Sequence, residues 1–376
     1  MLTISPSFGK KRGAMNELTV SAPGRICLLG EHQDYLGLSI LAGAINLRLT
    51  ISGKPRRDKL MRIKLPDIGE TEEFFLNEEI PYIKPRDYFR STVNILRRKG
   101  YVISRGWDCL VRGTIPINSG TASSSALVVA WVKFLLEAAG YHEVSHPADI
   151  AELAFLAEVA EFKESGGKMD HFSSAFGGVM FISFGKNFHY QQMKNPLSEF
   201  VIADSRQRKD TTGILAFIKS NVLQGVSQLR QHLPGFNLLS PLSPKVKEKI
   251  DGLEPDLKRL LLGTLKTRDL TLQGKRLFEI EPFSDKKFGE LLSAQHQILR
   301  DYLKISTPKI ETMLESAMKA GALGGKINGS GGGGCIFVYC PGKSEEVAAA
   351  LENQGFNPLT IKIDEGLKKE YSGRHS

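Results

Sequence analysis

The order of apolar and polar positions predicts several strands in the first half of the chain. Residues 17–29 (ELTVSAPGRICLL) alternate and then become continuously apolar, as a strand interrupted at Pro23 would. Residues 38–53 are rich in Ile, Leu and Thr, and residues 107–120 contain another strand that ends at Pro116. Two shorter apolar runs, GVMFISF and FVIADS, predict further strands.

Helical patterns separate and follow these strands. Residues 126–139 are apolar on nearly all sides, which predicts an internal helix. A second helix begins at Pro147, a residue suited to a first turn, and ends at Gly166. Further along, the clearest helical pattern begins at Thr307 and stops at Gly321.

The change from short strands to longer helical patterns near residue 205 predicts the domain organisation. We expect an α+β protein of two domains, residues 16–205 and 206–376. The first 15 residues lack the apolar region of a secretory signal, and Met15 is an alternative start to Met1.

Composition narrows the classes of function. The chain has 376 residues, 41% hydrophobic and 24% charged, which is typical of a globular protein. Its net charge of +9 is spread out rather than gathered in a basic stripe, so we expect no nucleic-acid partner and some attraction of anionic ligands. No apolar run approaches the ~20 residues that span a bilayer, and the 4 cysteines form no CxxC pair. We therefore predict a cytoplasmic protein with reduced thiols and no membrane partner.

The segment SGTASSSALVVAW, residues 119–131, places glycine and serine directly before an apolar helix. These residues weaken a helix start, whereas the free N–H groups and positive dipole of a helix N-terminus attract phosphate. Glycine lets the backbone approach a ligand closely, and a serine hydroxyl is a ligand that Mg²⁺ accepts. The pattern favours a nucleotide triphosphate, but it lacks a Walker A lysine, and an ordinary serine-rich helix cap is the alternative. The residues concerned are Gly120, Ser123, Ser124 and Ser125.

A polar loop interrupts the apolar residues 22–45. Glu31, His32 and Asp34 lie close together on this short, glycine-bounded loop. Carboxylates accept hydrogen bonds from hydroxyl groups, and imidazole donates or accepts them, so this set suits a sugar or another polyol. The alternative is a solvated polar turn, which the apolar flanks argue against.

A third segment, GGKINGSGGGGCIFVY at residues 324–339, passes from glycines into an apolar strand. A flexible linker rarely enters a strand directly, and a Rossmann turn needs its glycines to follow a strand and precede a helix. Neither alternative fits this order. Asp170 lies just beyond the glycine end of the helix that starts at Pro147, and by itself it is typical of a turn or cap.

Together these segments resemble the GHMP kinases, the family that includes galactokinase, homoserine kinase, mevalonate kinase and phosphomevalonate kinase. The matching motifs are APGRICLLGEHQDYLG, PINSGTASSSA and KINGSGGGGC, in the order of the family and over roughly residues 20–345. The GEHQDY loop, the segment AEVAEFKESGGKMDH and residues 296–317 are similar to galactokinase. The resemblance implies a two-domain GHMP kinase fold, with an N-terminal ribosomal-S5-like domain and a C-terminal ferredoxin-like α/β domain.

The resemblance also implies ATP-dependent phosphorylation of a sugar at its anomeric hydroxyl, with ATP and Mg²⁺ as cofactors. Asp170 would take the hydroxyl proton, and Arg25 would keep Asp170 ionised and neutralise phosphoryl charge. Ser124 and Glu158 would hold Mg²⁺, with Glu161 as the reserve candidate. The remaining roles fall to Glu31, His32 and Asp34 for the sugar, and to Gly120, Ser123, Ser124, Ser125, Gly329 and Gly331 for ATP.

The chain departs from the family pattern in ways that leave the sugar open. No match appears for a sugar-contacting tyrosine after residue 205. The replaced residues are Gln33, Leu36 and Leu38 in the first motif, Thr121 and Ala122 in the second, and His171, which stands where galactokinases carry Gln.

We expect a neutral sugar rather than a uronic acid, because Glu31 would repel a C6 carboxylate. Mevalonate or another small alcohol is an alternative acceptor, which the carboxylate-rich loop disfavours. A non-catalytic sugar-sensing relative is a third reading. The presence of Asp170, Arg25 and the serines of the second motif argues against it.

Overall fold

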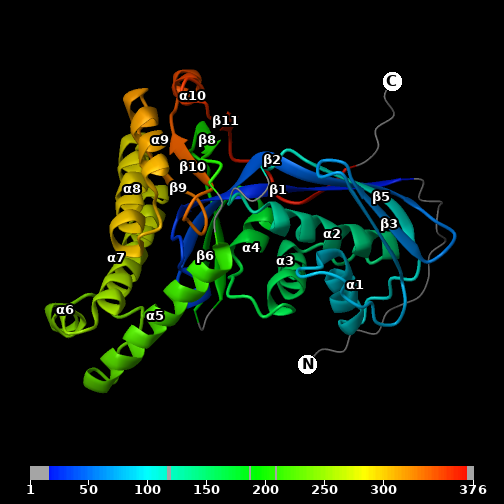
Figure 1. The fold of residues 1–376 in the computed structure, drawn as a ribbon, viewed down its shortest axis with the longest axis horizontal. Helices are drawn as coiled ribbons and strands as arrows, with labels where there is room; N and C mark the ends of the chain where they lie inside the picture. The colour runs from blue at the N-terminus through cyan, green and yellow to red at the C-terminus, as the bar shows by residue number, and fades with distance from the viewer. Residues whose placement is uncertain (1–16, 117–119, 186–187, 208–209, 371–376) are drawn as a thin grey trace.

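The computed structural model describes residues 17–116, 120–185, 188–207 and 210–370, and it contains two β-sheets flanked by helices (Figure 1). Met15, the alternative start, lies outside the described residues, and so do residues 117–119 of the segment predicted to finish at Gly120. No helix among the described residues is both long and apolar enough to cross a bilayer.

The larger sheet has eight strands within the described residues. These are β1 (Leu18–Leu29), β2 (Ile40–Pro55), β3 (Leu60–Leu65), β4 (Glu70–Phe75), β5 (Trp107–Gly113), β6 (Val179–Ser183), β7 (His189–Met193) and β12 (Lys368–Glu370). Their order is β12-β1-β2-β5-β3-β4, with β6 paired to β2 and β7 to β6. The β1–β2 pairing shifts register between Pro23 and Arg25, which confirms the interruption predicted at Pro23.

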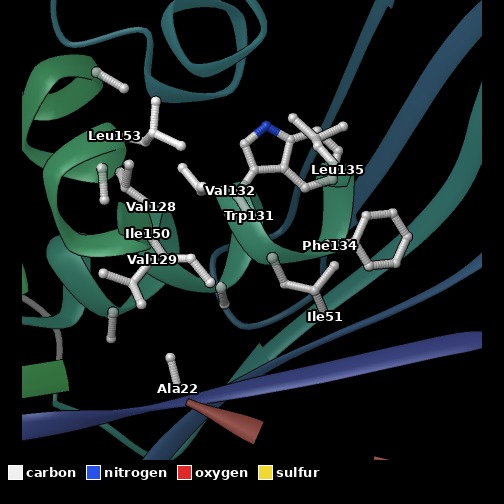
Figure 2. Packing of buried hydrophobic residues seen from close by; sticks show 14 of the residues in the cluster. Ala22, Ile51, Val128, Val129, Trp131, Val132, Phe134, Leu135, Ile150 and Leu153 are labelled. Carbon is white, nitrogen blue, oxygen red and sulfur yellow. The ribbon is translucent and has the colours of Figure 1, made fainter. Parts of the chain in front are cut away.

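Helices α1–α4 lie on one side of this sheet (Figure 1). Their bounds are α1 (Tyr88–Arg98), α2 (Ser123–Ala139), α3 (Pro147–Phe155) and α4 (Met169–Phe176). As predicted, α2 is internal: Trp131 and Phe134 are buried in the core together with Ile51 of β2 and Ile150 of α3 (Figure 2). Because apolar side chains cover α2 on nearly all sides, its axis is fixed by packing, and its N-terminus is held in place.

The smaller sheet has the order β11-β8-β10-β9, and its strands β8, β9 and β10 are buried on both faces. Along β10, Ile336 and Val338 face one apolar cluster, whereas Phe337 and Tyr339 face another that also contains residues of β1. The elements of this part are β8 (Phe200–Asp204), α5 (Thr211–His232), α6 (Pro244–Asp251), α7 (Pro255–Phe278), α8 (Asp285–Ile298), α9 (Pro308–Lys319), β9 (Gly324–Ile327), β10 (Cys335–Tyr339), α10 (Ser344–Glu352) and β11 (Pro358–Ile361).

The chain crosses between the two sheets more than once. β8 precedes residue 205 but pairs with β10 and β11, and β12 near the C-terminus returns to pair with β1. The division into residues 16–205 and 206–376 therefore stays a prediction.

Two helix boundaries differ from the predicted ones. α2 begins at Ser123, so the serines form its first turn rather than preceding the helix. The helix that starts at Pro147 ends at Phe155 and continues as a π-helical turn, η2 (Leu156–Ala160), before the predicted glycine end. π-Turns inside helices often occur at functional sites, and this one carries Glu158.

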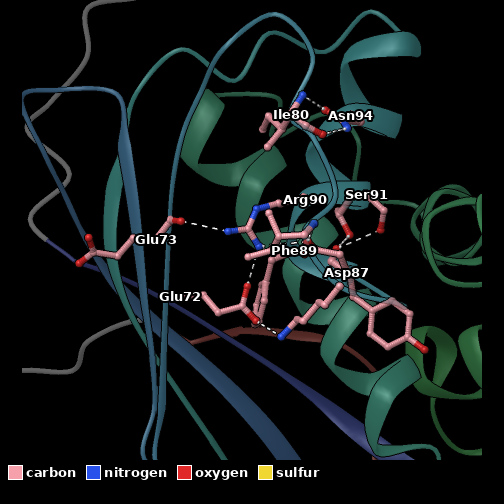
Figure 3. Close-up of polar contacts among 12 residues, drawn as sticks. Glu72, Glu73, Ile80, Asp87, Phe89, Arg90, Ser91 and Asn94 are labelled. Carbon is pink, nitrogen blue, oxygen red and sulfur yellow. Dashed lines mark hydrogen bonds and ion pairs between the residues drawn. The ribbon is translucent and has the colours of Figure 1, made fainter.

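Buried polar contacts hold α1 against η2 and against β4. Arg90 of α1 pairs with Glu72 of β4 and with Asp87, and Asn94 bonds both backbone groups of Ile80 (Figure 3). The Ser91 hydroxyl donates to the carbonyl of Ala157 at 2.8 Å. These bonds fix the turn in which Glu158 lies.

Candidate active site

One cavity of about 1030 Å³ brings the three sequence motifs together. Its size suits a nucleotide together with a small second ligand. Eleven of the twelve residues proposed from the sequence for catalysis or for binding sugar, phosphate or metal line this cavity, and the exception is Gly331. The lining includes Arg25, Glu31, His32, Asp34, Gly120, Ser123, Ser124, Ser125, Glu158, Asp170 and Gly329.

The mouth of α2 opens into this cavity. Ala122 occupies the N-cap position with φ 62°, a left-handed conformation that favours glycine, and its side chain makes no capping hydrogen bond. The N–H groups of the first turn are therefore not covered by a side-chain cap from this residue. Such a helix end suits a phosphate group, as the sequence predicts.

Arg25 and Asp170 form a two-pronged ion pair beside this mouth. Arg25 Nε lies 2.7 Å from Asp170 Oδ1, and Nη2 lies 2.8 Å from Oδ2. The third guanidinium nitrogen, Nη1, donates to the carbonyl of Gly120. Arg25 is almost fully buried, whereas the Asp170 side chain is 28% exposed toward the cavity. The pair thus links β1, α4 and the segment before α2, and it leaves a carboxylate accessible.

The polar loop lies on the other side of Asp170. The carboxylate of Asp34 accepts the N–H of Met169 at 3.2 Å, and a Cβ at Gly167 would lie 1.9 Å from Asp34 Oδ2. Burial and the charge of Asp170 raise the pKa of Asp34 to about 6. Two carboxyl groups therefore face one region of the cavity and influence each other.

His32 is oriented by contacts on both ring nitrogens. Nε2 lies 3.2 Å from the carbonyl of Ser330 and donates to it, so Nδ1 accepts from the hydroxyl of Tyr35 at 2.7 Å. Ser330 also lies 3.2 Å from Thr211 at the start of α5, hydroxyl to hydroxyl. The loop, the third motif and α5 therefore enclose the same end of the cavity.

Glu31 differs from the role expected of it. Its carboxylate pairs with Lys326 of β9, and it also accepts the N–H of Gly329. Both side chains are buried, Glu31 at 1% and Lys326 at 0% exposure. Because Lys326 neutralises Glu31, the predicted repulsion of a C6 carboxylate by Glu31 loses its physical basis.

In the third motif, Gly329 and Gly331 both contact other parts of the protein. The N–H of Gly329 is bonded to Glu31, so it is not free for ATP, although Gly329 does line the cavity. Gly331 does not line it: a Cβ there would lie 2.5 Å from Ile305, so its backbone packs against that side chain. The prediction that Gly331 binds ATP finds no support in this geometry. Asn328 instead ties the motif to Cys27 and to Gly120, at 3.0 Å and 2.8 Å.

Glu158 lies at the α2 mouth, close to the serines. Its carboxylate accepts a hydrogen bond from His171 Nε2 at 2.7 Å. Burial opposes ionisation, but this bond and the nearby hydroxyls of Ser124 and Ser125 hold the pKa of Glu158 below its usual range. Glu161, the reserve candidate, points elsewhere: it bonds Arg98 and Tyr82 outside the cavity.

The oxygens of Glu158 and Ser124 fit Mg²⁺, which prefers hard oxygen ligands and usually keeps waters and phosphate oxygens as well. Among the described residues no group of three or more His, Cys, Asp or Glu could hold a metal ion by itself. A cation at this place would therefore depend on the phosphates of a nucleotide.

Several residues of the site were not predicted from the sequence. Lys326 and Asn328 stand in the quoted motif KINGSGGGG without an assigned role. A lysine between apolar residues signals a buried cation that needs an anionic partner, but the partner is 295 residues away. Residues between β8 and the first turns of α5 also line the cavity, and no pattern in the sequence connects them with the motifs. They are Asp204, Arg206, Gln207, Asp210, Thr211, Thr212 and Leu215.

Three protein-family models match the chain. Residues 87–178 match the GHMP kinases N terminal domain, and residues 281–357 match GHMP kinases C terminal. Residues 6–55 match the galactokinase galactose-binding signature.

Curated relatives and solved structures point to the same group of proteins. A mevalonate kinase of Pyrococcus furiosus is 29% identical over 94% of this chain and 98% of its own, and a galactokinase of Haemophilus influenzae is 29% identical over 89% and 88%. The Lactococcus lactis galactokinase complexed with galactose superposes with a TM-score of 0.79 at 22% identity, covering 95% of this chain and 96% of that one. The Methanococcus jannaschii mevalonate kinase gives 0.71 at 18% identity, covering 94% and 100%.

Proposed function

This chain belongs to the GHMP kinase family, and from that membership we propose that it is an ATP-dependent sugar kinase acting on the anomeric hydroxyl of a neutral monosaccharide. The observation that carries the proposal is the Arg25–Asp170 pair, which lies between the serine-lined mouth of α2 and the loop with His32 and Asp34. The galactose-binding signature at residues 6–55 supports a sugar as the acceptor.

The accessible carboxylate of Asp170 is the base in this proposal. It accepts the proton of the acceptor hydroxyl, whose oxygen bonds to the γ-phosphorus of ATP. The bond from that phosphorus to the β–γ bridging oxygen breaks, and ADP leaves with the electron pair. Arg25 pairs with Asp170 and adds positive charge where the phosphoryl group passes.

The α2 mouth binds the phosphates, with Ser123, Ser124 and Ser125 as hydroxyl donors. Ser124 and Glu158 would hold Mg²⁺. When bound, the ion neutralises phosphate charge.

The buried carboxylate of Asp34 supports an uncharged acceptor. Its raised pKa reflects burial and the charge of Asp170, so a further anion placed beside it would be repelled. Since Lys326 neutralises Glu31 and Arg25 pairs with Asp170, the preference for a neutral sugar rests on Asp34.

Mevalonate is a second candidate acceptor. The Pyrococcus furiosus mevalonate kinase is as similar to this chain as the galactokinase is, and Arg206 lines the cavity without an ion pair to any described residue. A free guanidinium there would suit a carboxylate.

A coupled assay of ADP release over hexoses, pentoses, galacturonate and mevalonate tests these candidates. We expect turnover with a neutral hexose, galactose first. Faster turnover with mevalonate would replace the proposal by the second candidate, and faster turnover with galacturonate than with galactose would contradict a neutral acceptor. Nucleotide binding without turnover on any substrate would favour a sugar sensor.

A further inference from the structure

His171 and Glu158 form a buried contact that the proposed reaction does not use. The ring nitrogen Nε2 lies 2.7 Å from Glu158 Oε2, and the two side chains are 1% and 8% exposed. The ring of Phe155 packs edge-to-face against His171, with centroids 5.8 Å apart and an angle of 88° between planes. Packing therefore leaves the imidazole little freedom to turn.

The hydrogen-bonding pattern determines which ring nitrogen of His171 carries the hydrogen. Nδ1 of His171 is buried and has no hydrogen-bond partner among the described residues. A hydrogen on Nδ1 would be a buried donor without an acceptor, which is costly. The hydrogen therefore belongs on Nε2, where it is donated to Glu158.

The same helix carries the proposed base. Asp170 and His171 are consecutive in the first turn of α4, and successive side chains of a helix point about 100° apart. Asp170 points to Arg25, whereas His171 points to Glu158, which lies near the serines of α2. α4 therefore sets the positions of two acidic groups in the cavity, one directly and one through His171.

We propose that His171 is a positioning residue that orients the carboxylate of Glu158 for the magnesium–nucleotide complex. This rests on the proposed function, because it assumes that Glu158 is a ligand of that cation. A carboxylate held by a fixed N–H donor presents its remaining electron pairs in one direction, and donors of this kind tune the affinity of the ligands they hold.

Two variants with side chains of similar size distinguish the hydrogen bond that His171 donates from the space that its ring fills. His171→Met removes the donor and fills the space with a flexible apolar chain. His171→Gln supplies an amide N–H at a similar reach. The measurement is Mn²⁺ affinity by electron paramagnetic resonance, in the presence of a non-hydrolysable ATP analogue, with nucleotide affinity in EDTA as the control.

We expect His171→Met to weaken Mn²⁺ binding about 10- to 100-fold, with metal-free nucleotide affinity unchanged. His171→Gln should recover most of the loss. If the Met variant does not fold, His171→Phe, which keeps a ring beside Phe155, takes its place. Wild-type affinity for Mn²⁺ in the donor-free variant, or equal losses in the Gln and Met variants, would overturn the proposal. A wild-type protein that binds no nucleotide would instead refute the kinase function, and the positioning role with it.

Discussion

At the scale of single residues, charge and burial assign the roles in this site. Arg25 and Asp170 share two hydrogen bonds, yet only Asp170 keeps part of its side chain open to the cavity. A guanidinium that is buried and always charged is well suited to hold a carboxylate ionised. For Asp34, which lies next to this pair, burial and the charge of Asp170 instead raise the pKa to about 6.

Replacing Asp170 by Asn should remove the base while preserving the shape of the site. We expect kcat to fall by about 10²- to 10⁴-fold, with ATP affinity changed little. Steady-state ADP release and nucleotide titration by calorimetry measure the two quantities. Asp256→Asn, a change at the exposed start of α7, serves as the control. Full activity in the Asp170→Asn variant would show that Asp170 is not the base.

The raised pKa of Asp34 predicts a pH dependence for acceptor binding. Below about pH 6 Asp34 is protonated and accepts fewer hydrogen bonds, so kcat/KM for the sugar should decline on that side. The same shift affects stability. Between pH 3.8, the ordinary pKa, and about pH 6, Asp34 holds a proton in the folded state that it has lost in the unfolded state. Its contribution to the free energy of unfolding therefore falls as the pH rises through this range.

A pH–rate profile of the wild-type protein and of Asp34→Asn tests this. The acid limb near pH 6 should disappear in the variant, whose kcat/KM should be uniformly lower. An unchanged acid limb in the variant would assign that ionisation to another group.

At the scale of secondary-structure elements, the start of α2 forms the end of the cavity that we propose holds the nucleotide. The helix is buried on nearly all sides, so its position is rigid, and Ala122 enters it with φ 62°. Left-handed backbone costs most residues roughly 1–2 kcal/mol, and the surrounding packing offsets that cost.

The effect of a substitution at Ala122 on stability should therefore depend on how readily the new residue adopts a positive φ. Ala122→Val places a β-branched residue at positive φ and should lower the free energy of unfolding by about 1–3 kcal/mol. Ala122→Gly accepts this conformation and should stay within about 1 kcal/mol of wild type, because relieved strain offsets the greater freedom of glycine when unfolded. Urea unfolding midpoints compare the two. A Val variant as stable as the Gly variant would mean that the turn is not strained.

At the scale of the whole molecule, residues 326–330 join the two sheets around the site. Lys326 bonds Glu31, Asn328 bonds Cys27 and Gly120, and Ser330 bonds His32. The contact between the third motif and the polar loop is thus buried and charged, and it fixes the position of the loop proposed to bind the acceptor.

Removing one partner of the Lys326–Glu31 pair should destabilise the protein. Lys326→Met leaves Glu31 as a buried carboxylate without its cation and should destabilise the protein by about 3–5 kcal/mol. Adding Glu31→Gln should recover much of that loss. A double-mutant cycle from urea unfolding, followed by the fluorescence of Trp107 and Trp131, measures the coupling. Additive effects of the two substitutions would argue against a coupled pair.

Much of the fold and part of the site follow from local patterns. The strand at residues 17–29, the internal helix before residue 140 and the helix from Pro308 were predicted because side-chain periodicity reports burial of one element at a time. The placement of Asp170 in the first turn of a helix, and the π-turn that carries Glu158, were missed, since glycines between Lys163 and Met169 pointed to a break rather than to a new helix.

The sequence by itself determined the family, the order of the three motifs and the residue types that gather in the cavity, because helix mouths, polar loops and glycine turns have local signatures. Only the tertiary structure decided what each of those residues contacts. Glu31 and the N–H of Gly329 turned out to bond each other, Gly331 to pack on Ile305, and Glu158 rather than Glu161 to lie beside Ser124. The physical reason is that partners for buried charges and backbone N–H groups come from segments far away in the chain, and no local pattern records them.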